Sequence, residues 1–232
     1  MQRLKLLGLA LVAVFALSAA VTAVASAEVS FLPEGSVAEP VKFKATSGLS
    51  TLEELNKQAV ICNSDKGTGE VTSKTLGHFV VEFAECHATI GGTAVPCADL
   101  SQKEDAVGII NVEGEFHLRM GLTGQPLGIV AFLVNPDVHF LCSIALFVVL
   151  GCAAGEITPL ESLVNTVKVE LFQKAGENEI LSIDNEAETA MEECTLLVKK
   201  GTGTEETAGE ETHEELTNFK KNGVAVTALI HA

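Results

Sequence analysis

The chain has 232 residues, of which 47% are hydrophobic and 20% charged, with 15 Lys and Arg against 31 Asp and Glu. The net charge of −16 argues against binding to nucleic acid, because affinity for phosphate backbones rests on Lys and Arg that displace counterions. The same charge disfavours docking on anionic lipid. The chain contains eleven Phe but neither Trp nor Tyr. This composition argues against polysaccharide binding, since sugar rings stack on the flat, polar-edged Trp and Tyr side chains.

The amino-terminal segment has the organisation of an export signal. Arg3 and Lys5 form a short basic region, and an uncharged apolar run extends from Leu6 to about Val24. Ala25-Ser26-Ala27 supplies the small residues that a signal peptidase accepts, so we expect cleavage after Ala27. The alternative is an uncleaved segment retained as a membrane anchor, since the run is long enough to span a bilayer.

Removal of residues 1–27 leaves a mature chain of 205 residues with a net charge of −18. We expect residues 28–232 to form an exported β-rich domain, with a subdivision near residues 155–165 as the alternative. Its location would be secreted or in the cell envelope.

All six cysteines lie in the exported part, and an even number outside the cytoplasm predicts three disulfides. They are Cys62, Cys86, Cys97, Cys142, Cys152 and Cys194. Sequence alone leaves 15 connectivities open. A metal site is the weaker alternative, because the adjacent Cys86 and His87 cannot close a tetrahedral site by themselves.

Local geometry favours Cys86 with Cys97 as one pair. The two flank a ten-residue segment that contains the turn dipeptide Gly91-Gly92, so they could face each other across a hairpin. The remaining pairs would then be Cys152 with Cys194 and Cys62 with Cys142.

Short alternating or β-branched runs recur along the mature chain, separated by Gly, Asn, Asp or Pro, which is typical of an antiparallel sheet protein. Expected strands are 41–45, 59–62, 79–83, 107–112, 115–120, 166–172, 195–199 and 224–230, with a turn at 67–69 leading into a further strand. The fold class predicted is all-β, an antiparallel sandwich or partly closed barrel stapled by disulfides.

The uncharged run Val138–Ala154 has 17 residues, near the lower limit for a membrane helix. It is rich in Val, Ile and Phe and follows the turn signal Asn135-Pro136-Asp137, which favours two strands buried on both faces over a membrane span.

Helix signals are limited to two short segments. Ser50-Thr51-Leu52-Glu53 matches a capping box, and the Ala- and Glu-rich segment 184–193 could form two or three turns. Residues 201–215 contain no apolar residue larger than Ala, so we expect a solvated hairpin tip or linker.

No motif assigns chemistry to the chain. The sequence contains no G-x-S-x-G nucleophile motif, no phosphate-binding loop, and no pair of histidines at metal-ligand spacing. The acids of residues 201–215 lack the alternating pattern of a calcium loop. Any two of the 31 acids could form a catalytic pair in space, but the spacing singles out none. We therefore predict no catalytic, cofactor-binding or metal-binding residue.

Several short motifs resemble those of uncharacterised exported proteins of high-GC Gram-positive bacteria. The resemblance covers about residues 40–160 and rests on turn glycines, cysteines and strand residues. The motifs are Ala45-Thr46-Ser47-Gly48, Ile61-Cys62, Lys66-Gly67-Thr68-Gly69-Glu70-Val71-Thr72, Val81-Glu82-Phe83-Ala84-Glu85-Cys86, Pro96-Cys97, Phe140-Leu141-Cys142 and Gly155-Glu156-Ile157-Thr158-Pro159. It implies an exported β-rich protein with strands at 138–150, and it supplies no activity. Cys152 and Cys194 look like additions to that pattern, which also favours pairing them.

Together these features predict an exported structural or interaction module of the cell envelope that contacts an envelope protein or a wall polymer. The alternatives are a secreted hydrolase with a carboxylate-based site and a membrane-tethered exodomain. A hydrolase should show a cleft of a few hundred Å³ with converging polar groups and displaced pKa values, as observed for many active sites.

Overall fold

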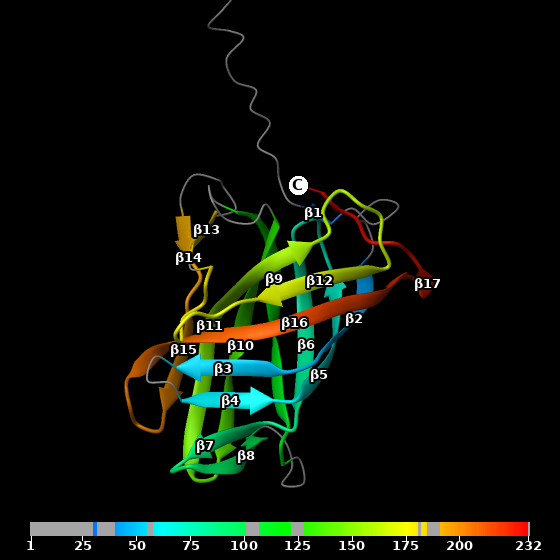
Figure 1. Ribbon diagram of the computed structural model, residues 1–232. Coiled ribbons are helices and arrows are strands. Elements are labelled where there is room, and N and C mark those ends of the chain that lie inside the picture. Colours follow the sequence, from blue (N-terminus) through cyan, green and yellow to red (C-terminus); the bar gives the residue numbers. More distant parts are fainter. Residues whose placement is uncertain are drawn as a thin grey trace, which may run out of the picture.

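A computed structural model describes residues 30–31, 40–54, 58–100, 107–121, 128–180, 182–184 and 191–231. The expected signal segment 1–27 lies outside these residues. All the secondary structure within them is β-strand, which confirms the all-β prediction (Figure 1). The strands are β1 (Ser30–Phe31), β2 (Val41–Ser47), β3 (Ser50–Glu54), β4 (Ala59–Cys62), β5 (Ser64–Val71), β6 (Leu76–Ala84), β7 (His87–Ile90), β8 (Thr93–Asp99), β9 (Ile110–Met120), β10 (Gly128–Cys142), β11 (Ala145–Thr158), β12 (Thr166–Leu171), β13 (Ser182–Asp184), β14 (Met191–Glu193), β15 (Leu196–Lys200), β16 (Glu205–Lys221), β17 (Val224–Ala225) and β18 (Ile230–His231).

Three long strands, β10, β11 and β16, hold the sheet together, because each pairs with different strands along its length. The first ring of antiparallel pairings runs β16-β2-β5-β6-β9-β10-β11-β12 and returns to β16. The second ring runs β16-β3-β4-β7-β8-β10-β11-β15 and also returns to β16. Some pairings are short, such as the two residue pairs between β4 and β7, so the whole is a partly closed barrel rather than one even barrel.

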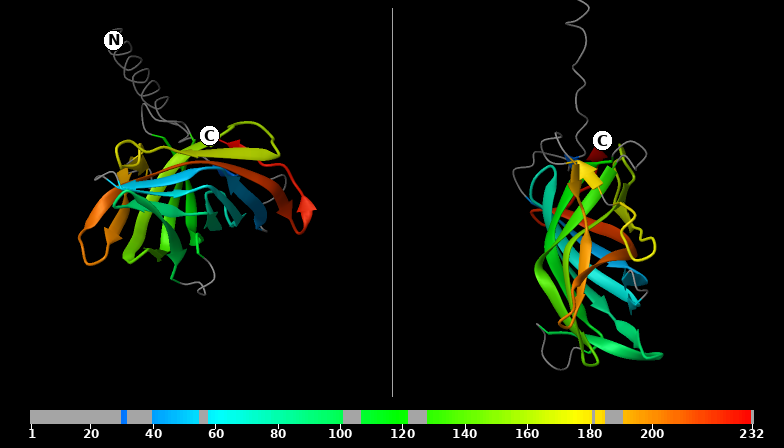
Figure 2. Two further views of the ribbon diagram at one scale, coloured as in Figure 1. Left: turned by 60° about the horizontal axis from the view of Figure 1, so that its bottom comes forward. Right: turned by 90° about the vertical axis from the view of Figure 1, so that its left-hand side faces the viewer.

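The two rings lie at opposite ends of the same curved sheet, with β12 near one end and β7 and β8 near the other (Figures 1 and 2). Each ring surrounds its own hydrophobic cluster. The first-ring cluster includes Phe43, Phe79, Phe116 and Val169 from four different strands. The second-ring cluster includes Phe140, Phe147 and Leu196, together with four of the cysteines. Alternation along each strand directs these side chains inward, as the sequence pattern predicts.

A third, smaller cluster lies on the outer face of β10 and β11. Ile129 and Ala131 on β10 pack against Ile180 and Ile183, which follow β12 in the chain. The disulfide Cys152–Cys194 joins β11 to Cys194, which follows β14 and belongs to the same cluster. The beginning of β10 is therefore buried on both faces, which explains why this region of the sequence carries no charge.

The expected membrane-helix alternative at Val138–Ala154 is wrong, because these residues form the end of β10 and the beginning of β11. The two strands form an antiparallel hairpin from Ile129↔Glu156 to Cys142↔Ala145. Asn135-Pro136-Asp137 does not end a strand as predicted, and instead forms an exposed irregularity within β10 where the register shifts between Val134 and Val138. Within the described residues, no helix is long and apolar enough to cross a bilayer.

All six cysteines form disulfides, as predicted, and Cys152–Cys194 is the expected pair. The other two pairings were wrong: the bonds are Cys62–Cys86 and Cys97–Cys142. The predicted hairpin does exist, with β7 and β8 joined by Gly91-Gly92, and the N–H of Cys97 donates to the carbonyl oxygen of Cys86 at 2.9 Å.

The reason for the actual pairing is the order of the strands. The four cysteines form one row across β4, β7, β8 and β10, in the order Cys62, Cys86, Cys97, Cys142. Neighbouring strands lie about 4.8 Å apart, so Cys62 and Cys142 stand about 14 Å apart at the ends of the row. A disulfide spans at most about 7 Å between Cα atoms, so bonding the two inner sulfurs would leave both outer ones unpaired.

Three further expectations need correction. The capping-box segment at Ser50 forms strand β3 instead of a helix, because its backbone pairs with β4 and β16. Gly67-Thr68-Gly69 does not form a turn and lies within β5. Residues 224–230 do not form one strand, since β17 and β18 are separate two-residue strands.

Two further expected segments, 184–193 and 107–120, differ from the structure or are described only in part. The ends of the Ala- and Glu-rich segment 184–193 lie in β13 and β14, and residues 185–190 are outside the described residues. Residues 110–112 and 115–120 belong to one strand, β9, with Gly114 inside it. Residues 107–109 of the expected strand precede β9, and Val107 forms only an isolated bridge with Ala98.

Candidate binding cavity

Strand β16 contains the largest departure from the sequence prediction. Residues 205–215, expected in a solvated tip or linker, belong to this 17-residue strand. Alternation directs Glu211, which is exposed, outward, whereas Glu210, Thr212 and Glu214 face the interior of the barrel. Thr212 and Glu214 are only 1% and 7% exposed. Residues 205–215 are thus polar on both faces of the strand, yet β16 is a strand of both rings.

Asp65, at the start of β5, lies beside these residues and is 6% exposed. Its carboxylate accepts hydrogen bonds from the Ser47 N–H at 3.0 Å, from the Ser47 hydroxyl, and from the Ser50 hydroxyl at 3.4 Å. The Ser50 hydroxyl also bonds that of Thr212 at 2.8 Å. These residues occupy the junction where β2 and β3 diverge along one edge of β16, so their polar groups fill a gap in the backbone ladder.

The carboxyl of Glu214 is hydrogen-bonded to that of Asp65. Two carboxyl groups can bond in this way only when one of them carries a proton. Burial, followed by the charges of Asp65 and Glu210 and the hydrogen bond to Asp65, raises the pKa of Glu214 to about 9. Burial also raises the pKa of Asp65, although hydrogen bonds from its neighbours oppose the rise. Glu214 is therefore the protonated partner at neutral pH.

Glu210 is the third acid of this group. Burial, followed by the charge of Asp65, raises the pKa of Glu210 to about 7. We call Asp65, Glu210 and Glu214 the acid cluster. Within the described part of the chain, no Lys, Arg or His forms an ion pair with any of the three. The cluster thus keeps negative charge in a buried setting without a protein cation to balance it.

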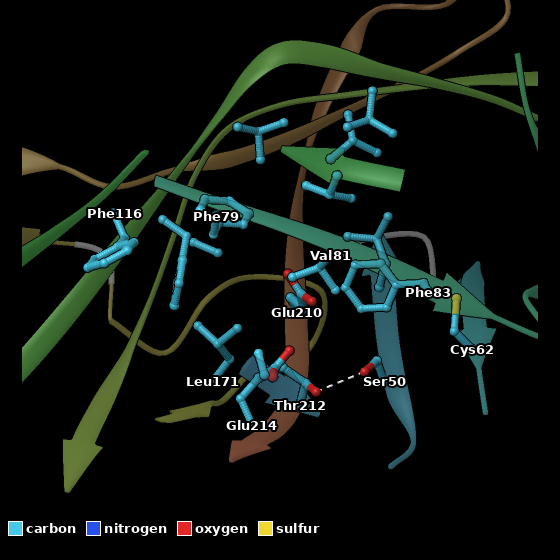
Figure 3. A pocket seen from close by; sticks show the side chains of 18 of the residues that line it. Ser50, Cys62, Phe79, Val81, Phe83, Phe116, Leu171, Glu210, Thr212 and Glu214 are labelled. Atoms are coloured by element: carbon cyan, nitrogen blue, oxygen red, sulfur yellow. Dashed lines mark hydrogen bonds between the residues drawn. The ribbon is translucent and has the colours of Figure 1, made fainter. Parts of the chain in front are cut away.

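A cavity of about 120 Å³ lies between the two hydrophobic clusters and reaches the acid cluster. Apolar side chains from both rings form most of its lining, among them Phe43, Phe79, Phe116 and Phe140. Its polar lining consists of Ser50, Thr51, Thr68, Glu210, Thr212 and Glu214. Figure 3 shows Glu210, Thr212 and Glu214 extending from one strand towards the apolar side chains of this lining, with the Ser50–Thr212 hydrogen bond beside them.

Sequence reasoning predicted no site residue and therefore missed this group. A signal was present, since Ala208, Glu210, Thr212, Glu214 and Leu216 follow a period of two along β16. The period was obscured because the inward positions are mostly polar or small. The six cysteines, which were the residues that the sequence singled out, all form structural disulfides.

Among the described residues, no group of three or more His, Cys, Asp or Glu side chains is placed to hold a metal ion. In the acid cluster, the carboxyl of Asp65 is hydrogen-bonded to that of Glu214 and to two neighbouring hydroxyls, and Glu210 interacts with Asp65 through its charge.

No protein-family model matches the chain, and no curated protein or solved structure is significantly similar to it.

Proposed function

We propose that the chain is an exported binding module that takes a small, mostly apolar molecule into the interior of its barrel. The observation that carries this proposal is the cavity of about 120 Å³ between two packed cores, lined by phenylalanine side chains and closed on one side by the acid cluster. Protein interiors are close-packed, so a void of this size is costly to keep empty. An apolar cavity of about 150 Å³ in another protein binds benzene, which sets the scale of ligand that suits this one.

Three disulfides support an extracytoplasmic location, since such bonds persist in oxidising compartments. A protein with this role would hold a volatile or sparingly soluble compound, or the end of a larger apolar one, outside the cytoplasm. An envelope protein or a wall polymer as partner remains a prediction from the sequence, and the interior cavity supports a small molecule instead.

A secreted hydrolase is the second candidate, and one observation favours it. The three converging carboxyls have raised pKa values, as general acids do. The cavity is nevertheless smaller than the few hundred Å³ expected of a hydrolase cleft, and most of its wall is apolar. Binding without turnover fits these dimensions better.

The test is the effect of toluene on thermal unfolding. A ligand that binds only the folded state raises the melting temperature with its concentration. We expect such a rise for the natural protein and its loss in Val81→Phe, since Val81 lines the cavity and a larger side chain would occupy it. The control is Val80→Phe on the same strand, because Val80 points outward and is 47% exposed.

No rise with toluene, or an equal rise in Val81→Phe, would contradict the proposal. Should Val81→Phe fail to fold, methyl-group NMR of the natural protein replaces it. Toluene should then shift the methyl signals of Val81, Leu171 and Leu196, which line the cavity, and leave that of Val80 unchanged.

A further inference from the structure

The acid cluster gives the cavity one chemically distinct end. Of the polar side chains in its lining, Ser50 and Thr212 use their hydroxyls on each other. Among the described residues of the lining, Glu210 and Glu214 are the only ionisable side chains. A polar group that a ligand places at this end of the cavity will therefore meet carboxyl oxygens.

One of these oxygens is available. The Oε2 atom of Glu214 is buried and accepts no hydrogen bond from a donor of the described residues, and the residue as a whole is 7% exposed. A buried acceptor without a donor loses the hydrogen bonds that water gave it, at a cost of about 1–3 kcal/mol. A ligand that donates a hydrogen bond at this position would recover that free energy.

The charge of the cluster narrows the choice of donor. Apart from its bond with the carboxyl of Glu214, Asp65 accepts hydrogen bonds from a backbone N–H and two hydroxyls, which carry no charge. The charge of Asp65 raises the pKa of both Glu210 and Glu214, and no Lys, Arg or His of the described chain forms an ion pair with these acids. Charges interact strongly in such a poorly solvated setting. A cation is attracted there, a neutral donor satisfies only the hydrogen bond, and an anion is repelled.

We infer that the ligand is a small apolar amine, an inference that rests on the proposed function. Its ammonium group pairs with Glu210 and Glu214, while its apolar part lies among the phenylalanine rings of the cavity. An ammonium group carries three N–H donors, enough to reach Oε2 of Glu214 and the carboxyl of Glu210 together. The apolar part supplies burial, and the ammonium supplies selectivity.

The experiment compares four probes of one size at pH 7 by isothermal titration calorimetry. The probes are toluene, benzylamine, benzyl alcohol and benzoate. We expect benzylamine to bind at least about tenfold more tightly than benzyl alcohol, a difference equivalent to about 1.4 kcal/mol, and benzoate to bind more weakly than toluene. The preference should disappear in the double variant Glu210→Gln/Glu214→Gln. It should persist in Glu211→Gln, which removes an exposed charge from the neighbouring position.

The outcomes separate this inference from the proposed function. If toluene binds but benzylamine binds no more tightly than benzyl alcohol, the amine inference is wrong and the apolar cavity stands as a site. An equal preference in the double variant would also overturn the inference, because the charge would act from elsewhere. If none of the four probes binds, the proposed function itself fails.

A second measurement uses the natural protein alone, in case the double variant does not fold. An ammonium group favours the charged form of the carboxyls beside it, so benzylamine should displace protons from the cluster. Calorimetry in two buffers of different ionisation enthalpy should therefore show proton release with benzylamine and none with toluene. Absence of proton release with bound benzylamine would count against contact with the acid cluster.

Discussion

The hydroxyl groups of Ser50 and Thr212 lie 2.8 Å apart, although 162 residues separate them in the chain. Ser50 begins β3, and Thr212 lies near the middle of β16, between the residues that pair with β3 and those that pair with β2. Their hydrogen bond joins β3 to β16 at the junction of the two rings, and both residues line the cavity between Glu210 and Glu214. The stability of the fold and the shape of the cavity therefore depend on the same contact.

Substituting Ser50 or Thr212 singly should lower the stability of the fold by different amounts. Ser50→Ala leaves the buried Thr212 hydroxyl without its partner, which costs about 1–3 kcal/mol of unfolding free energy. Thr212→Val should cost less, because Ser50 keeps its hydrogen bond to Asp65. Urea unfolding of both single variants and the double variant measures the coupling, and we expect the double variant to lose less than the sum. Strict additivity would show that the two hydroxyls do not depend on each other.

The acid cluster predicts a stability that falls as pH rises. The pKa of Glu214 is about 9 in the folded protein, against an ordinary value of 4.5, and that of Glu210 is about 7. Between pH 4.5 and 9 the folded state holds a proton on Glu214 that the unfolded state has lost, so rising pH favours unfolding. The slope for one such group is at most about 1.4 kcal/mol per pH unit. Below pH 4.5 this contribution no longer changes.

Glu214→Gln isolates that effect, because glutamine is neutral at every pH and can still donate a hydrogen bond to Asp65. We expect the variant to match the natural protein near pH 5 and to be more stable at pH 8, as measured by urea unfolding at several pH values. Asp65 and Glu210 interact with Glu214 through their charges, so the substitution should also change the pH range over which these two acids titrate. Glu211→Gln serves as the control, and its stability should follow the pH curve of the natural protein. Parallel curves for Glu214→Gln would show that Glu214 is ionised in the folded state.

The sequence allowed the strand-rich fold to be predicted wherever one face of a strand is apolar. Val41, Phe43 and Ala45 alternate with exposed Lys and Thr, and they do form β2 with the apolar residues inside. The same logic failed at β16, since its inward residues Glu210, Thr212 and Glu214 are those that a solvated loop would also contain. The hydrogen bond between Glu214 and Asp65 joins two residues that are far apart in the chain, so the local pattern of β16 gives no sign of it.

The cysteines show the same limit. Local sequence placed Cys86 and Cys97 opposite each other correctly, but the bond each sulfur forms depends on which strand lies on its other side. That neighbour is β4 for Cys86 and β10 for Cys97, and both are set by long-range pairing. Only Cys152–Cys194, for which no competing cysteine stands in the row, could be paired from the sequence.

Gly69 should be intolerant of a side chain. A Cβ atom there would overlap the ring of Phe43 and lie 2.7 Å from the carbonyl oxygen of His78. Overpacking of this kind costs about 1–3 kcal/mol, so Gly69→Ala should lower the melting temperature by several degrees. Because Phe43 also lines the cavity, the same variant should bind toluene less tightly. Gly48→Ala is the matched control, since no atom lies within 4 Å of its added Cβ, and it should leave the melting temperature nearly unchanged.

The row of cysteines gives a prediction about single substitutions. Cys97→Ser should leave one free thiol, and it should be that of Cys142, because these two residues are bonded. Cys62→Ser should likewise free Cys86. Alkylation without reduction, followed by mass spectrometry, identifies the free residue, and each variant should lose about 2–5 kcal/mol of stability with its bridge. An alkylated Cys86 in Cys97→Ser would show that the two inner cysteines of the row are bonded to each other. In that case Cys62 and Cys142 of the natural protein, at the two ends of the row, would also react as free thiols.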